Sequence, residues 1–283
     1  MAPKQKLPRH ASKLHPVPLG LIKVPPAGVT QRPELPSLID KLVAELDLDK
    51  LGFPVMNHRG GVFWCIDGQH RIKALIKFGF ALEDTVQCEV FEGLTDEQMA
   101  CIFLGRDDRR AIAPFHKFLI ACTAGRVRET AIRRVVEAHG LKIDRARTST
   151  SISAVGALNK IYDTSPAKDI AIGWVVRVAR GGFNGDPKGF DAIVLDALGL
   201  IFNRHGARMH EKELIVRLSN RAHGLHGLLQ RMEAEHTKHG RPKTHCLAKE
   251  IVETYNRGLT TRSPSRLPPW WRVDANDATD AHV

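Results

Sequence analysis

Residues 62–75 read VFWCIDGQHRIKAL and decide the first part of the fold. Five apolar residues indicate a buried strand, and the Asp67-Gly68 pair after them is a turn signal. Ile72 and Leu75 then recur at helical spacing, so the stretch predicts a strand that turns directly into a helix. Amides at such a helix start point outward with the positive end of the helix dipole, and Gly68 permits close approach to the backbone. This geometry suits a phosphate group.

The flanking sequence predicts a small mixed sheet around this turn. Asp67 is expected to cap the helix and Gly79 to end it. A strand is expected at 19–24, a helix at 38–46, a hairpin from 54–56 and 62–66, and a further strand at 86–90. Thr95 and Gln98 have capping-box spacing and predict another helix start.

Beyond Gly105 the pattern is helical, without a convincing strand. The sequence therefore predicts an α/β protein: a small mixed sheet with helices, then a mostly α-helical domain. The expected divisions are a flexible arm at 1–16, a first domain at 17–112, a helical domain at 113–258 and a disordered tail at 259–283. The predicted helices cover 114–124, 127–139, 152–162, 170–178, 192–202, 212–218 and 247–255.

Composition places the chain among globular proteins. It has 283 residues, of which 43% are hydrophobic and 26% charged, and no uncharged apolar stretch approaches the roughly 18 residues of a membrane span. Its five cysteines are scattered and form no Cys-x-x-Cys pair, which favours a reducing compartment. We expect a cytoplasmic protein without a membrane partner.

Positive charge is concentrated in the middle of the chain. The formal net charge is +11; residues 1–104 carry twelve basic and twelve acidic side chains, whereas residues 105–160 carry 12 and 5. Clustered Lys and Arg supply most of the sequence-independent affinity for nucleic acid, although a solvated basic surface has the same composition. The candidate DNA-binding residues are Arg126, Arg128, Arg133, Arg134, Lys142, Arg145 and Arg147.

The predicted turn also gathers chemically active side chains. Gln69, His70 and Arg71 fall in the first helical turn, where a phosphate would meet amides, an imidazole and a guanidinium together. Asp67 and His70 are candidate catalytic residues: His70 could act as a general acid or base, and Asp67 could bind a metal or orient a neighbour. A capping Asp and a phosphate-contacting His explain the same residues without catalysis.

Three segments together resemble the ParB/sulfiredoxin superfamily, in particular ParB-like nuclease-domain proteins of phages, plasmids and actinobacteria. They are residues 19–33 (LGLIKVPPAGVTQRP), 68–74 (GQHRIKA) and 106–114 (RDDRRAIAP). The resemblance implies the superfamily's small mixed sheet and a nucleotide site that binds CTP with Mg²⁺ and gates a DNA clamp. By position, the nucleotide-binding residues would be Gly68, Gln69, His70, Arg71, Arg109 and Arg110.

Departures from the family pattern keep several functions open. Gln69-His70 stands where partition proteins have Glu-Arg, which leaves the magnesium and cytosine contacts unassigned. Sulfiredoxin chemistry is disfavoured, because its cysteine would fall at Gln69. We expect a DNA-associated protein with a partition or regulatory role, which leaves open whether it forms a homodimer. The alternatives are a metal-dependent nuclease using Asp67 and His70, and an inactive regulator that binds a protein partner through the Trp270-Trp271 tail. No metal ligands are assigned.

Overall fold

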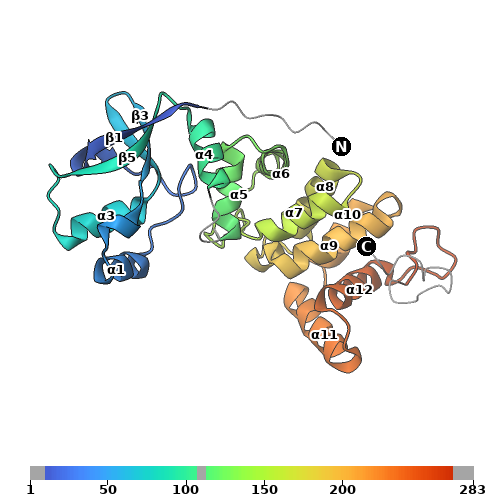
Figure 1. The fold of residues 1–283 in the computed structure, drawn as a ribbon. Helices are drawn as coiled ribbons and strands as arrows, with labels where there is room; N and C mark the ends of the chain where they lie inside the picture. Colours follow the sequence, from blue (N-terminus) through green and yellow to red (C-terminus); the bar gives the residue numbers. More distant parts are fainter. Residues whose placement is uncertain (1–9, 107–112, 270–283) are drawn as a thin grey trace. The chain divides into compact units, whose positions relative to one another are not determined.

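A computed structural model of the chain describes residues 10–106 and 113–269. It divides into two compact units, with the division between Val127 and Arg128. The first unit contains a mixed five-stranded sheet and the second is helical (Figure 1). The predicted α/β class is confirmed. Over the described residues, no helix combines the length and apolar character that a membrane crossing requires.

The sheet has the strand order β1-β5-β3-β4-β2. β3 and β4 form the predicted antiparallel hairpin, while β5 runs parallel to β3 and β2 runs parallel to β4. The antiparallel edge strand β1 completes the sheet beside β5. The strand bounds are β1 Ser12–Pro18, β2 Ile22–Lys23, β3 Val55–Arg59, β4 Val62–Asp67 and β5 Thr85–Glu92.

Strand β1 overturns part of the predicted flexible arm. It pairs with β5 from Ser12 opposite Phe91 to Pro18 opposite Thr85, and Val17 is completely buried. Prolines are tolerated here because an edge strand can turn a missing N–H toward solvent. The prediction of a flexible arm is therefore wrong for residues 12–16, while residues 1–9 lie outside the described chain.

Side chains of the sheet alternate between two apolar cores. Met56 and Cys65 join one core with Leu75 of α3, whereas Val55 and Ile66 join the other with helix α4. This is the period-two alternation of strands. α1 lies beside α3 (Figure 1). The helices of this unit are α1 Pro36–Ala44, α2 Leu48–Leu51, α3 Gln69–Phe78, α4 Asp96–Gly105 and α5 Pro114–Thr123.

Helix α5 belongs to the first unit. Ile120 and Ala124 are buried in the same core as Met99 and Phe103 of α4. The sequence had placed the domain boundary before this helix, at 112/113, because the strand pattern stops at Gly105. The structure places it after α5, since the α5 side chains complete the core on that face of the sheet.

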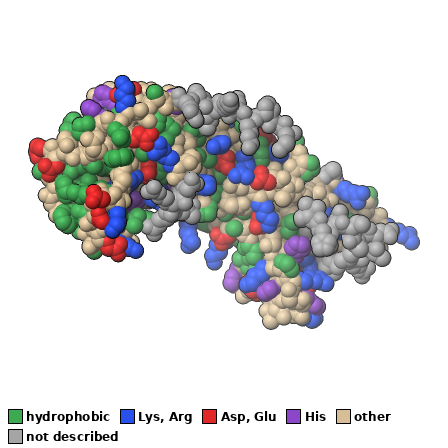
Figure 2. Space-filling model, viewed as in Figure 1, with side chains coloured by type: hydrophobic (Ala, Val, Ile, Leu, Met, Phe, Trp, Pro, Cys, Tyr) green, Lys and Arg blue, Asp and Glu red, His purple; other side chains and the backbone are tan. Residues whose placement is uncertain are grey.

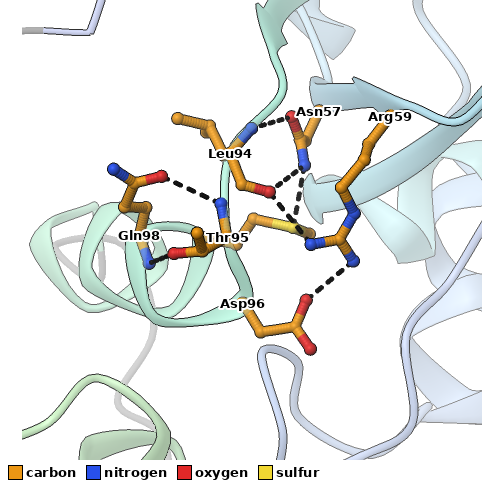
Figure 3. Close-up of polar contacts among 7 residues, drawn as sticks. Asn57, Arg59, Leu94, Thr95, Asp96 and Gln98 are labelled. Carbon is orange, nitrogen blue, oxygen red and sulfur yellow. Dashed lines mark hydrogen bonds and ion pairs between the residues drawn. The ribbon is translucent and has the colours of Figure 1, made fainter.

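A buried amide connects the hairpin to the start of α4 (Figure 3). Asn57 is completely buried; its Nδ2 donates to the Leu94 carbonyl at 3.0 Å and its Oδ1 accepts the Leu94 N–H at 2.9 Å. Arg59 donates to the same carbonyl and to Asp96. Thr95 and Gln98 form the predicted capping box, so the chain enters α4 at a fixed position.

The second unit is built around α9, which packs against α7, α8 and α12. Each predicted helix is confirmed, with shifted ends, but α11 was not predicted. Its glycines and three histidines interrupt the apolar periodicity on which the prediction depended. The bounds are α6 Val127–Ala138, α7 Val155–Thr164, α8 Lys168–Gly182, α9 Ala192–His205, α10 Glu211–Ser219, α11 Gly224–His239 and α12 Lys243–Asn256.

The beginning of the predicted disordered tail is anchored to α12. The Asn256 side chain exchanges two hydrogen bonds of 2.9 Å with the Leu267 backbone, and Leu267 is buried. Arg266 donates to the Leu259 carbonyl at 2.7 Å. The prediction of disorder is therefore wrong for residues 259–269. Trp270 and Trp271 lie outside the described residues.

Candidate phosphate-binding site

The turn from β4 into α3 has the geometry expected of an anion site. Gly68 is the N-cap residue of α3 and has a φ of 103°, in the left-handed region. A Cβ there would come within 2.9 Å of the Cβ of Pro54, so both the backbone angle and the close contact require glycine. No side chain caps α3, which leaves the amides of its first turn available to a ligand.

Asp67 and Arg71 bind each other in this turn. The prediction that Asp67 caps the helix is wrong, because Gly68 occupies the cap position and Asp67 Oδ2 accepts from Arg71 Nη2 at 2.9 Å. Arg71 Nη1 also donates to the carbonyl of Leu51 at 2.9 Å, and the Arg71 side chain is mostly buried. Arg71 thus joins the end of α2 to the start of α3.

Gln69 and His70 are buried and hold the preceding loop. Gln69 Nε2 donates to the Arg32 carbonyl at 2.8 Å, and His70 Nε2 accepts the Leu35 N–H at 3.1 Å. Gln31 is also buried and donates to the carbonyls of Cys65 and Ile66. These side chains therefore fasten segment 31–35 over the start of α3.

A cavity of about 360 Å³ opens at this turn. Four cationic side chains line it: Arg32, Lys50, Arg71 and Arg106. Lys50 pairs with Asp47 at 2.8 Å, and Arg106 pairs with Glu89 of β5 at 2.8 Å. Among the residues the structure describes, the Arg32 guanidinium has no hydrogen-bond or ion-pair partner.

The rest of the cavity lining is mainly apolar, with the Glu45 and Asp47 carboxylates among it. It combines side chains of α1, α2 and the loop between them with one aromatic ring from α4. A pocket with an apolar wall and a few converging polar groups is typical of a small-molecule site. It matches a ligand that carries both a flat apolar ring and a phosphate. The apolar residues are Leu38, Leu42, Leu46, Leu51 and Phe103.

The side chains at this cavity are less suited to binding magnesium or to acid–base catalysis. In the described part of the chain, no three His, Cys, Asp or Glu side chains are grouped so that they could hold a metal ion. Asp67 is already paired with Arg71. The His70 Nε2 atom accepts a backbone N–H, so this nitrogen cannot also take a proton from a substrate in the same geometry.

The cysteine beside the turn is packed rather than reactive. Cys65 is completely buried, and burial, with the nearby Asp67 carboxylate, raises the pKa of its thiol far above the ordinary value. A thiol held in its neutral form is a poor nucleophile.

The candidate DNA-binding arginines of α6 are largely occupied by acidic neighbours. Arg128 pairs with Glu129 and Asp163, Arg133 with Glu137, and Arg134 with Asp169. Figure 2 likewise shows basic and acidic side chains beside each other on the face viewed. The remaining candidates are exposed: Arg126 ahead of α6, and Lys142, Arg145 and Arg147 in the loop that follows it.

Comparison with protein families identifies the family to which the chain belongs. A family model described as a family of unknown function, DUF6551, matches residues 26–263. The chain belongs to the DUF6551 family. A search of curated proteins returns no match. The DUF6551 match begins after β2 and extends beyond α12, so it covers most of the described part of both units and every residue that lines the cavity.

The sequence pattern identified the cavity residues at the start of α3 but not the cationic residues from other segments. Gly68, Gln69, His70 and Arg71 all line the cavity, and their binding of a nucleotide stays a prediction; Gln69, His70 and Arg71 also hold the structure together. Lys50 was missed because no motif spacing marks it, whereas Arg32 and Arg106 appeared only within the first and third ParB-like segments. The predicted contacts Arg109 and Arg110 lie outside the described residues.

Proposed function

We propose that the first unit binds a nucleotide, with CTP as the leading candidate, in the cavity at the start of α3, and that the basic helical unit associates with DNA. Resemblance to ParB proteins supports a role in DNA partition or in regulation linked to DNA. The nuclease alternative receives no added support, because Asp67 and His70 are engaged in structural contacts.

The observation that carries the proposal is the convergence of three features on one cavity. The uncapped start of α3 offers backbone amides, and Arg32 offers a guanidinium without a partner among the described residues. Lys50 offers an ammonium group, paired with Asp47, on a side chain that is 85% exposed. Amides and cations together favour a phosphate group. The apolar side chains that line the same cavity favour a ring attached to that phosphate.

The nucleotide proposal is tested by thermal shift with the full chain. CTP, ATP, GTP and UTP, each with Mg²⁺, are compared with the corresponding nucleosides. A nucleotide that binds only the folded chain raises Tm by mass action, and we expect at least one triphosphate to do so while its nucleoside does not. Unchanged Tm across the triphosphates would contradict the proposal, and equal shifts from nucleoside and nucleotide would remove the phosphate from recognition.

DNA association would rest on the exposed loop after α6 rather than on α6 itself. Lys142, Arg145 and Arg147 are exposed, and Asp144 is the only acidic residue between Gly140 and Ser151. An arginine already bound to a carboxylate must give up that ion pair to bind a phosphate. Because Lys142 and Arg147 are exposed cations of this loop, the loop is expected to contribute more to DNA affinity than Arg133 and Arg134, which pair with Glu137 and Asp169.

Fluorescence anisotropy with a labelled duplex tests this part. We expect affinity to fall steeply between about 50 and 200 mM salt. Replacing Lys142, Arg145 and Arg147 with Gln should weaken binding to any sequence more than replacing Arg133 and Arg134 does. Salt-insensitive binding would contradict the proposal, and a larger loss from the α6 pair would contradict the role of the loop.

A further inference from the structure

A second basic cavity lies in the helical unit, separate from the nucleotide cavity. It has a volume of about 340 Å³ and is formed by α10, α11, the turn between them and the end of α12. Four arginines from these elements line it: Arg217, Arg221, Arg231 and Arg257. None of them was singled out by its position in the sequence, because their spacing follows no motif.

Two of these guanidinium groups have buried N–H groups without acceptors. The Arg221 side chain is only 5% exposed, and its Nη1 atom is buried without a hydrogen-bond partner among the described residues. The Arg231 Nη2 atom is buried and lacks a partner in the same way. An unpaired buried donor is costly, more so when it is charged. These donors indicate a missing acceptor.

The carboxylates nearby do not satisfy the four arginines. Glu250 accepts from Arg231 Nε at 2.9 Å but lies 3.9 Å from Arg221, beyond hydrogen-bonding distance. Glu213 accepts from Arg217, which also donates to the carbonyls of Tyr255 and Arg257. Within the described chain, the Arg257 side chain has no acceptor. Burial, with Arg231 and Arg257 close by, lowers the pKa of Arg221, as expected where positive charge is under-compensated.

The start of α11 lies at the edge of the same cavity. His223 is its N-cap residue, adopts a left-handed φ of 65° and lines the cavity, and no side chain caps the helix. The first amides of a 16-residue helix therefore lie beside the arginine cluster, with the positive end of the helix dipole. Arginines and helix amides together are the usual protein donors to a phosphate.

We propose that this cavity is a second anion site, which binds a compact phosphate group such as inorganic phosphate or pyrophosphate between Arg221, Arg231 and Arg257. The recessed position of Arg221 favours a small phosphate compound, since a duplex backbone cannot enter a cavity of this size. The anion would accept hydrogen bonds from the unpaired N–H groups of Arg221 and Arg231. It would thereby stabilise the packing of α10, α11 and α12.

The test is calorimetric titration of the full chain with inorganic phosphate and with pyrophosphate. All proteins carry Arg32→Gln, which weakens the proposed first site, so that the measured heat reports on the second. Arg257→Gln is the main variant, because the Arg257 side chain is exposed and makes no hydrogen bond or ion pair within the described chain. Arg241→Gln is the matched control, since Arg241 is exposed at the opposite end of α11. Glu250→Gln removes the competing carboxylate while keeping an acceptor oxygen.

We expect saturable binding of one pyrophosphate, weakened roughly tenfold by Arg257→Gln, as loss of a charge-assisted hydrogen bond predicts. Arg241→Gln should leave the affinity unchanged, and Glu250→Gln should increase it. Absence of saturable binding, or equal affinities of the Arg257 and Arg241 variants, would overturn the proposal. Binding of a DNA duplex that depends on Arg257 without any binding of pyrophosphate would also overturn it, because the acceptor would then be a nucleic-acid backbone.

Discussion

At the scale of single residues, Asn57 shows how one buried polar side chain fixes a connection. Its amide satisfies both backbone groups of Leu94 and also lies 3.2 Å from the sulfur of Met99. Asn57→Ala should lower the free energy of unfolding by about 2 kcal/mol, because buried backbone groups would lose their partner. Urea unfolding measures this. Asn203→Ala, at an exposed amide of α9, is the control and should change stability by less than about 0.5 kcal/mol. Equal effects would contradict the structural role of Asn57.

The residues of the cavity at the start of α3 divide by role at the same scale. Gln31, Gln69 and His70 are buried and bind backbone atoms, whereas Arg32 and Lys50 face the cavity with exposed or unpaired groups. The sequence pattern identified the turn because Gly68 and the adjacent polar run are contiguous. It could not show which polar side chains face inward, since that depends on where segment 31–35 crosses the start of α3.

At the scale of elements, close packing of α7 against α9 depends on Gly199. A Cβ at this position would lie 2.6 Å from Cγ1 of Ile161. Gly199→Ala should therefore destabilise the chain by about 1–2 kcal/mol, because overpacking outweighs the better helix propensity of alanine. Gly156→Ala on α7 has open space around it and should be neutral or stabilising by up to about 1 kcal/mol. Thermal unfolding of both variants checks the opposite signs, and the same sign in both would contradict the packing argument.

Elements with regular apolar spacing were predictable from the sequence, and elements fixed by tertiary contacts were not. α3, α4 and α9 carry their own periodicity and end signals. Strand β1 contains two prolines and becomes a strand only because β5 offers it an edge. α11 buries a narrow apolar stripe between glycines and histidines, and α12 supplies the surface that stabilises it.

At the scale of the whole molecule, His205 should make stability depend on pH. The ring is buried, and burial, with Arg204 and Arg208 nearby, lowers its pKa from 6.5 to about 4. Between these values the unfolded chain binds a proton that the folded chain does not. The free energy of unfolding should therefore fall as the pH drops from about 6.5 to 4, by up to about 3 kcal/mol from this residue.

His205→Gln should remove this part of the pH dependence. Urea midpoints at pH 7.5, 6, 5 and 4.5 provide the comparison, and the change with pH is measured within each protein so that any loss common to all pH values cancels. A smaller fall in the variant than in the wild type supports the assignment. Parallel pH profiles would show that another group causes the acid sensitivity.

At the same scale, the structure shows where the basic side chains lie. The net charge of +11 suggested a single acidic partner, but the structure distributes basic groups among an exposed loop after α6 and two cavities, one in each unit. Many other arginines are neutralised by ion pairs on their own helices or neighbouring ones. Net charge alone therefore overstates the surface available to DNA.

The central claim is that a nucleotide binds in the cavity at the start of α3, and titration calorimetry of Arg32→Gln tests it most directly. Arg32 lines the cavity without a partner among the described residues, so its replacement should spare the fold. Lys77→Gln, at a cation on α3 that pairs with Asp40 outside the cavity, is the control. With the nucleotide that gives the largest thermal shift, we predict roughly tenfold weaker binding to Arg32→Gln than to the wild type, and wild-type affinity in Lys77→Gln. Undiminished binding to Arg32→Gln would contradict the claim.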